Sequence, residues 1–149
     1  MRQTVFTLLL PVLAACRGQT PSSSLRDGRL APCPALPHCV STDVGEDAGH
    51  RMASIPFTDS PTDAQARARA ALLAEHRMTI VDDRPGYLRA EARTSVFRFV
   101  DDVELLVDST ERLIHFRSSS RVGHNDWNKN RERMERVASR LATSAAIAR

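Results

Sequence analysis

Residues 99–120, FVDDVELLVDSTERLIHFRSSS, contain the pattern that decides the fold. Apolar residues occupy every second position of 103–107, which is the repeat of a β-strand with one buried face. The polar run 108–111 has the composition of a turn, and residues 112–118 return with a second alternation. The apolar positions are Val103, Leu105, Val107, Ile114 and Phe116. The stretch therefore predicts an antiparallel hairpin.

The segments on the N-terminal side of this hairpin switch between helix and strand patterns. Ser60 is a typical helix cap and Pro61 follows at a position that proline favours, so a helix is expected from there through residue 77. Residues 87–94 alternate small or apolar side chains with charged ones, which indicates a half-buried antiparallel strand. Further strands are expected at 50–57 and 78–81, with a turn at 83–86.

The C-terminal residues predict a second, amphipathic helix that begins near Asn128 or Asn130. Its apolar face consists of Met134, Val137, Ala138, Leu141 and Ala145. Trp127, the one tryptophan of the chain, is expected to pack over the start of this helix. Helices and strands together predict an α+β fold, a mainly antiparallel sheet with two helices packed on one face, in a single domain over 32–149.

The N-terminal residues indicate export and lipid attachment. Residues 1–15 hold a short apolar run behind a basic N-terminus, which is typical of a signal peptide and too short for a membrane span. Leu13–Cys16 matches a bacterial lipobox, so Cys16 is expected to carry acyl chains such as palmitate. Arg17 stands where aspartate would signal inner-membrane retention, which favours the outer membrane. The expected protein is an envelope lipoprotein that faces the periplasm.

Two further cysteines follow a stretch rich in Ser, Pro and Gly. Residues 16–31 have no apolar repeat and are expected to form a flexible tether outside the fold. Cys33 and Cys39 are expected to form a disulfide, because an exported protein folds under oxidising conditions. A metal site made of both thiolates and His38 is the alternative, although short zinc knuckles usually space their cysteines more closely.

The stretch 117–126, RSSSRVGHND, holds candidate functional residues. Arginines, serine hydroxyls and the first amides of the last helix can together bind a carboxylate or phosphate. Nearby acids and histidines can instead hold a metal or support hydrolysis, and a serine of 118–120 can act as a nucleophile, but no recognised ligand spacing or nucleophile elbow is present. The candidate polar or anion site comprises Arg117, Ser118, Ser120, Arg121, Asp126, Arg131, Asp101 and Asp102.

A structural role for the same residues is the interpretation that needs no ligand. Arg117 and Arg121 can pair with the acids of 101–104 across neighbouring strands, for which arginine's planar fork is well suited. Asp126 can accept hydrogen bonds from the backbone donors that are exposed where a strand turns into a helix. In that case the polar stretch holds the fold together.

Ordered motifs recur along most of the chain. They are Cys33-Pro34, Pro37–Ser41, Phe97–Phe99, Asp101–Glu104, Arg117-Ser118, Ser120–Gly123, Asp126, Asn130-Arg131 and Arg133. Over 30–145 this set resembles the domain of unknown function 1499 family, which implies a bacterial exported or membrane-associated protein and carries no assigned activity. Two positions depart from the family pattern. His38 replaces an asparagine, and Asn128 replaces a glycine, a mild change because asparagine tolerates left-handed backbone.

These observations lead to one leading function hypothesis, a hydrolase as its alternative, and a third class, a purely structural lipoprotein that tethers envelope layers and would expose an apolar patch. The hypothesis is an envelope protein held to the membrane by its N-terminal lipid, with a non-catalytic domain that binds a periplasmic protein or a small anionic ligand. The alternative is an envelope hydrolase that uses Asp101, Asp102 and the 117–126 stretch. The net charge of +3, from 21 basic and 18 acidic residues, is too small to indicate nucleic-acid binding. Neither a metal nor a cofactor is expected.

Overall fold

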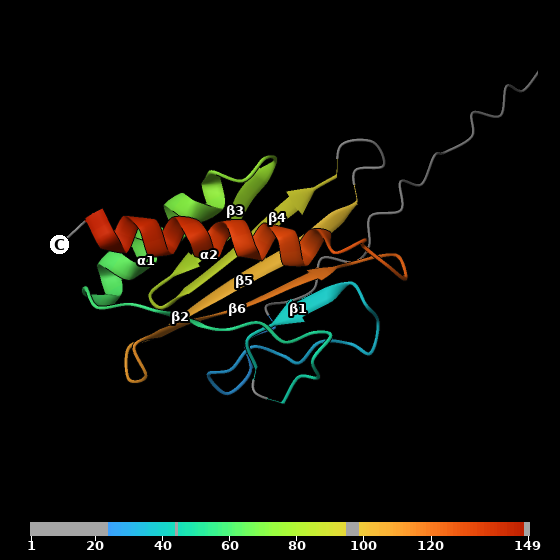
Figure 1. Ribbon diagram of the computed structural model, residues 1–149, viewed down its shortest axis with the longest axis horizontal. Helices are drawn as coiled ribbons and strands as arrows, with labels where there is room; N and C mark the ends of the chain where they lie inside the picture. The colour runs from blue at the N-terminus through green and yellow to red at the C-terminus, as the bar shows by residue number, and fades with distance from the viewer. Residues whose placement is uncertain (1–23, 44, 95–98, 148–149) are drawn as a thin grey trace, which may run out of the picture.

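An antiparallel sheet with two helices on one side forms the fold (Figure 1). The computed structural model describes residues 24–43, 45–94 and 99–147. The elements are β1 (Cys39–Ser41), β2 (Ile55–Pro56), α1 (Pro61–Leu73), β3 (Met78–Arg84), β4 (Tyr87–Arg93), β5 (Val100–Asp108), β6 (Leu113–Ser120) and α2 (Lys129–Ile147). The strand order is β1-β6-β5-β4-β3, and β2 also pairs with β6. The predicted α+β class is confirmed.

The core lies between the sheet and the two helices. Leu105 and Phe116, from the central hairpin β5–β6, have no exposed surface, as the alternation of that stretch predicts. The sheet-facing stripe of α1 is built mainly of alanines, so this helix can lie close to the strands. The buried helix residues are Ala64, Ala68, Ala71, Leu72, Met134, Val137 and Leu141.

The first helix begins as predicted and ends earlier. The Ser60 hydroxyl accepts a hydrogen bond from the Asp63 amide (3.1 Å), and Pro61 is the first helical residue. The helix ends at Leu73, four residues before the predicted end at 77. Arg77 itself adopts a left-handed φ of 56°, which cannot be part of a right-handed helix.

The predicted strand over 50–57 is reduced to the two residues of β2. The Asp47 carbonyl accepts hydrogen bonds from the amides of His50 (3.1 Å) and Arg51 (2.9 Å). This turn occupies the start of the segment, so only Ile55–Pro56 forms a strand and pairs with β6.

Strand β4 is buried on both faces, which corrects the prediction of a half-buried strand over 87–94. Arg89 and Glu91 point away from the helices and are 9% and 8% exposed. This face is partly covered by the N-terminal segment, because the Ser24 amide donates to Glu104 on the neighbouring strand β5 (2.9 Å). The polar face of the sheet is therefore part of the interior.

Residues 24–31 contact the domain, although the sequence assigns them to the tether. Leu30 is 6% exposed, and Ser24 is bonded to Glu104 through both its amide and its hydroxyl. The domain therefore begins no later than Ser24. The predicted signal peptide, Cys16 and the tether up to residue 23 lie outside the described residues. Within the described part of the chain, no helix is both long and apolar enough to cross a bilayer.

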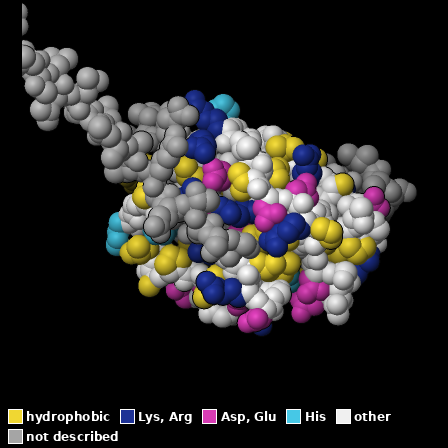
Figure 2. All heavy atoms as spheres, turned by 180° about the vertical axis from the view of Figure 1, so that it is seen from behind, with side chains coloured by type: hydrophobic (Ala, Val, Ile, Leu, Met, Phe, Trp, Pro, Cys, Tyr) yellow, Lys and Arg dark blue, Asp and Glu magenta, His cyan; other side chains and the backbone are white. Residues whose placement is uncertain are grey.

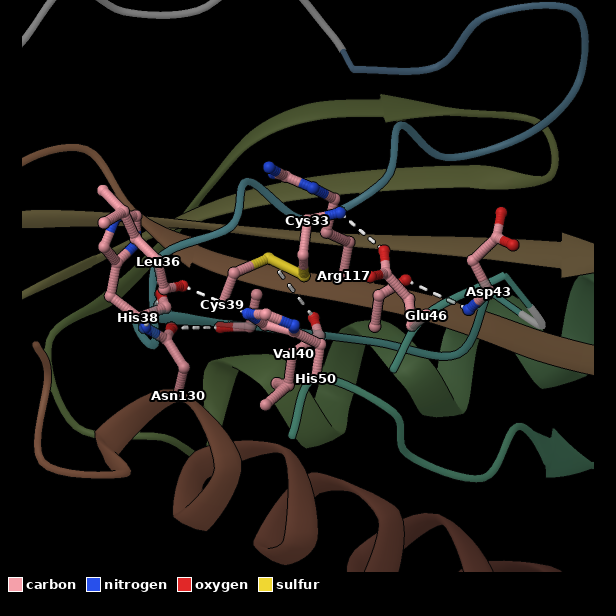
Figure 3. Close-up of a disulfide and its surroundings, with 12 residues drawn as sticks. Cys33, Leu36, His38, Cys39, Val40, Asp43, Glu46, His50, Arg117 and Asn130 are labelled. Atoms are coloured by element: carbon pink, nitrogen blue, oxygen red, sulfur yellow. Dashed lines mark hydrogen bonds between the residues drawn. A yellow bond between two sulfur atoms is a disulfide. The ribbon is translucent and has the colours of Figure 1, made fainter. Parts of the chain in front are cut away.

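A disulfide joins Cys33 to Cys39, which confirms the predicted pairing and overturns the metal alternative, since both sulfurs are used. The Cys33 amide also donates to Glu46 (2.5 Å; Figure 3). Replacing both cysteines by alanine is expected to lower the free energy of unfolding by about 2 kcal/mol, because the cross-link restricts the unfolded chain. Urea unfolding of parent and variant measures this difference, and coinciding midpoints would contradict it.

Candidate functional site

The residues predicted to form one polar site lie on two opposite faces of the sheet. Consecutive side chains of a strand point to opposite sides, so Asp101 and Ser118 face the helices, whereas Asp102 and Arg117 face away from them. We call the first group the helix-side cluster; it comprises Asp101, Ser118, Ser120, Asp126, Asn130 and Arg133. We call the second group the back-face network; it comprises Arg89, Glu91, Asp102, Glu104, Arg117 and Arg121.

Asn130 is the centre of the helix-side cluster and has no exposed surface. Its amide nitrogen donates to the His38 carbonyl (3.0 Å) and to the Ser120 hydroxyl (3.0 Å). Its oxygen accepts from Ser118 and from Arg133 (2.7 Å). One side chain therefore fastens the start of α2 to β6 and to the disulfide loop (Figure 3).

Arg133 forms an ion pair with Asp101, one of the two acids of this cluster. Its guanidinium donates to Asp101 (2.6 Å), and both side chains are largely buried, at 11% and 5% exposed. The sequence pattern offers Asn130 as a helix start and places both Asn130 and Arg133 in a family motif, but it assigns neither of them to the candidate site. Their spacing of three residues on a helix, which places both on the face toward β6, was the signal that could have assigned them.

Asp126 satisfies backbone donors before α2, as expected. Its carboxylate accepts from the amides of Asn128 (3.1 Å) and Asn130 (2.8 Å). Asn128 has a left-handed φ of 63°, in keeping with its replacement of a glycine. Trp127 is 80% exposed, so the expectation that it packs over the start of α2 is wrong.

Arg131 is not brought together with the other candidate residues. Its guanidinium donates to the carbonyls of Gly49 (2.8 Å) and Arg51 (3.3 Å). The helical repeat turns Arg131 away from its neighbour Asn130, so it cannot point toward the sheet as Asn130 does. The predicted convergence of Arg131 with Arg117 and Arg121 is therefore not found.

The back-face network contains the predicted pairing of Arg121 with Asp102. Both ends of the guanidinium bond that carboxylate (2.7 and 2.8 Å), and one end also reaches Glu91 (2.5 Å). Arg89 donates to Asp102 from the other side (3.3 Å). The hydrogen bonds that Arg121 donates to Asp102, and then the one it donates to Glu91, raise the pKa of Arg121 above its usual range, although burial alone would lower that pKa. Figure 2 shows basic and acidic side chains side by side on this face.

Glu104 is also held internally and is 2% exposed. It accepts hydrogen bonds from the Tyr87 hydroxyl and from the amide and hydroxyl of Ser24. Arg117 lies opposite it in the sheet, but the nearest distance between the guanidinium and the carboxylate is 3.8 Å. The predicted pair of Arg117 and Glu104 is thus an ion pair without a direct hydrogen bond.

A pocket of about 350 Å³ opens over this network. Its lining residues are Ser24, Pro34, His38, Arg89, Asp102, Glu104, Arg117, Ser119, Ser120 and Arg121. Two of its lining residues each hold a buried nitrogen, Nε of Arg117 and Nδ1 of His38, that has no hydrogen-bond partner within the described part of the chain. Both residues lie beside the disulfide (Figure 3). A buried polar atom without a partner is rare in a folded protein and is one mark of a binding site.

One further group of possible metal ligands lies at the opposite end of the hairpin. Ligand atoms of Asp108, Glu111 and His115 come within 4.8 Å of one another. The Asp108 carboxylate accepts from the amides of Thr110 (2.7 Å) and Glu111 (2.9 Å), and His115 lies 3.3 Å from Glu111. These contacts are those of a hairpin turn, and nothing beyond proximity indicates a metal.

Comparison with protein families gives one match. The model described as "Protein of unknown function (DUF1499)" matches residues 29–141, which include both cysteines of the disulfide, the back-face network and most of α2. No curated protein matches the chain.

Proposed function

The chain belongs to the DUF1499 family, and from that premise we propose that it is a lipid-anchored envelope protein whose domain binds a small anionic ligand without catalysis. The anchor is the acylated Cys16, and the domain faces the periplasm, with the outer membrane favoured by Arg17. The observation that carries the binding role is the pocket lined by Arg117 and His38, each with a buried nitrogen that has no partner among the described residues.

The charge of the pocket wall favours an anion. Three arginines line it, against the two carboxylates of Asp102 and Glu104. Arg121 donates to Asp102 and Glu91, and Arg89 donates to Asp102. Among the described residues, Arg117 comes no closer to a carboxylate than 3.8 Å, from Glu104, so its donors are left for a ligand. A guanidinium presents parallel donors that match a carboxylate or a phosphate, so the ligand chemistry is that of a small oxyanion.

The engagement of the acids supports a binding role rather than hydrolysis. Asp102 is held by Arg121 and Arg89, and Asp101 by Arg133 on the other face of the sheet. A general base or a nucleophile needs a free lone pair within reach of a substrate. Because guanidinium groups occupy the lone pairs of these carboxylates, the carboxylates are poorly placed to act as a base or a nucleophile.

Anion binding can be tested with inorganic phosphate and acetate as probes. We expect one of the two to raise the melting temperature, because a ligand at one hundred times its Kd stabilises by about 2.7 kcal/mol. Arg117→Gln should remove that response. Arg69→Gln is the matched control, since Arg69 is exposed and pairs with Asp83 on the surface. An equal response of Arg117→Gln and parent would contradict the assignment.

A turnover assay on the same protein distinguishes a binding role from catalysis. Turnover of a p-nitrophenyl ester or phosphate that disappears in Asp102→Asn, in a variant that still binds phosphate, would replace the proposal by the hydrolase alternative. Mass analysis of Cys16 in the mature protein tests the anchor separately.

A further inference from the structure

Described residues from three segments of the chain meet at one end of the sheet, the right-hand end in Figure 1. The register places them together, because the His38 carbonyl accepts from the Ser120 amide (3.0 Å) and the Val100 carbonyl accepts from the Arg121 amide (3.0 Å). We call this the loop end. It comprises residues 34–38, Arg93, Thr94, Phe99 and 121–129.

The loop end exposes large apolar side chains from three separate segments. Trp127 is 80% exposed, Phe99 41% and Leu36 36%. Trp127 is held out by a left-handed backbone with φ of 49°, which is uncommon for a bulky residue. A tryptophan held in this way, together with two further apolar side chains, resembles the aromatic side chains that proteins place at membrane interfaces.

The exposed charges of the loop end are basic. They belong to Arg93 and Lys129, whereas Asp126, the acid among the described residues of the loop end, is only partly exposed. Arg93 and Lys129 each also contact an acid, Glu91 and Glu132, outside the loop end. The turn at the opposite end of the hairpin carries the acids Asp108 and Glu111 beside the exposed Arg112. The two exposed cations of the loop end, Arg93 and Lys129, are the groups that can approach the phosphates of an anionic surface.

The length of the tether is compatible with this orientation. Cys16 and Ser24 are eight residues apart, which spans at most roughly 26–29 Å. Ser24 is fixed to Glu104, about 13 Å along β5 from its first residue Val100. A lipid on Cys16 can therefore lie in the plane of the loop tips.

We propose that the loop end contacts the surface of an anionic phospholipid membrane, with Trp127 inserted at the headgroup level. This inference rests on the proposed anchor at Cys16. The strands then stand on the membrane, and the pocket by Arg117 lies close to the surface from which an anionic ligand would come.

Trp127 reports on this contact by itself, since the chain has one tryptophan. The test uses the full, lipidated chain in vesicles of phosphatidylglycerol and phosphatidylcholine with brominated acyl chains. We expect its fluorescence to shift to shorter wavelength, to be quenched by the brominated lipid and to be shielded from acrylamide. A chain that floats with the vesicles while Trp127 stays open to acrylamide and unquenched by lipid overturns the inference and leaves the anchor standing. A chain that carries no lipid and does not float overturns both.

A second measurement isolates the affinity of the loop end itself. In the unlipidated Cys16→Ser chain, Trp127→Ala should weaken vesicle binding by about tenfold, the effect of losing a partly buried indole. Val81→Ala is the control, because Val81 is 45% exposed on the edge strand β3, outside the loop end. Equal losses in both variants would contradict a specific contact through Trp127, as would shielding of Trp127 only when a protein partner is present.

Discussion

Replacing Arg121 by alanine is expected to lower the free energy of unfolding by about 3–5 kcal/mol, the range for breaking a buried ion pair by removing one partner. The side chain is 7% exposed and binds two carboxylates that are themselves 5% and 10% exposed. Without the guanidinium, the partners left among the described residues are Arg89 for Asp102, through longer bonds, and Arg93 for Glu91. Urea unfolding followed by circular dichroism measures the loss.

Two further variants keep this expectation testable if the alanine variant does not fold. Arg121→Lys retains the charge and loses the planar fork, so it should fall between parent and alanine. Arg69→Ala removes a surface partner that is 51% exposed and should change stability by no more than about 1 kcal/mol. A loss for Arg121→Ala as small as that for Arg69→Ala would show that the network contributes nothing to the fold.

Asn130→Ala is the second large effect, with an expected loss of about 2–4 kcal/mol. Removal of the amide takes a bond from the His38 carbonyl and leaves the Ser118 hydroxyl with Arg133 alone. A hydrogen bond contributes about 0.5–1.5 kcal/mol, and the Asn130 amide makes several of them in a buried place. Equilibrium unfolding measures the total, and hydrogen exchange should show the faster opening first in the early turns of α2.

The control for Asn130 is the same substitution at an exposed asparagine. The Asn125 side chain accepts one bond from the Trp127 amide in an exposed loop (2.7 Å), so Asn125→Ala should lose much less. Comparable losses at Asn125 and Asn130 would mean that Asn130 does not fasten α2 to the sheet.

The strand and helix pattern could be predicted where the apolar repeat is regular. The hairpin β5–β6 and the start of α1 at Ser60 follow from alternation and capping, which are local properties. The short β2 could not be predicted, because the turn at Asp47 that displaces it carries no periodic signal. The sequence also did not predict that residues 24–31 cover part of the polar sheet face, because this segment has no apolar repeat either.

The candidate site could be predicted in its residues and not in its geometry. Arg117, Arg121 and Asp102 do lie together, because they follow one face of adjacent strands. Asp101 was grouped with Asp102, although strand geometry puts neighbours on opposite faces, and Arg131 was grouped with Arg121 without regard to the helical repeat. The exposure of Trp127 could not be predicted, because its left-handed backbone is not indicated by the neighbouring residues.

The most direct measurement compares Arg117→Gln with Arg121→Gln for both unfolding free energy and phosphate binding. We expect Arg121→Gln to lower the free energy of unfolding by about 3 kcal/mol or more, because Asp102 and Glu91 lose their shared guanidinium. Arg117→Gln should lose less stability than Arg121→Gln, because Arg117 lies 3.8 Å from Glu104 and makes no direct hydrogen bond to it, and it should lose the anion. Arg121 is thus assigned to the stability of the fold and Arg117 to anion binding. This assignment would be contradicted if Arg117→Gln unfolded while Arg121→Gln kept its stability and lost phosphate binding.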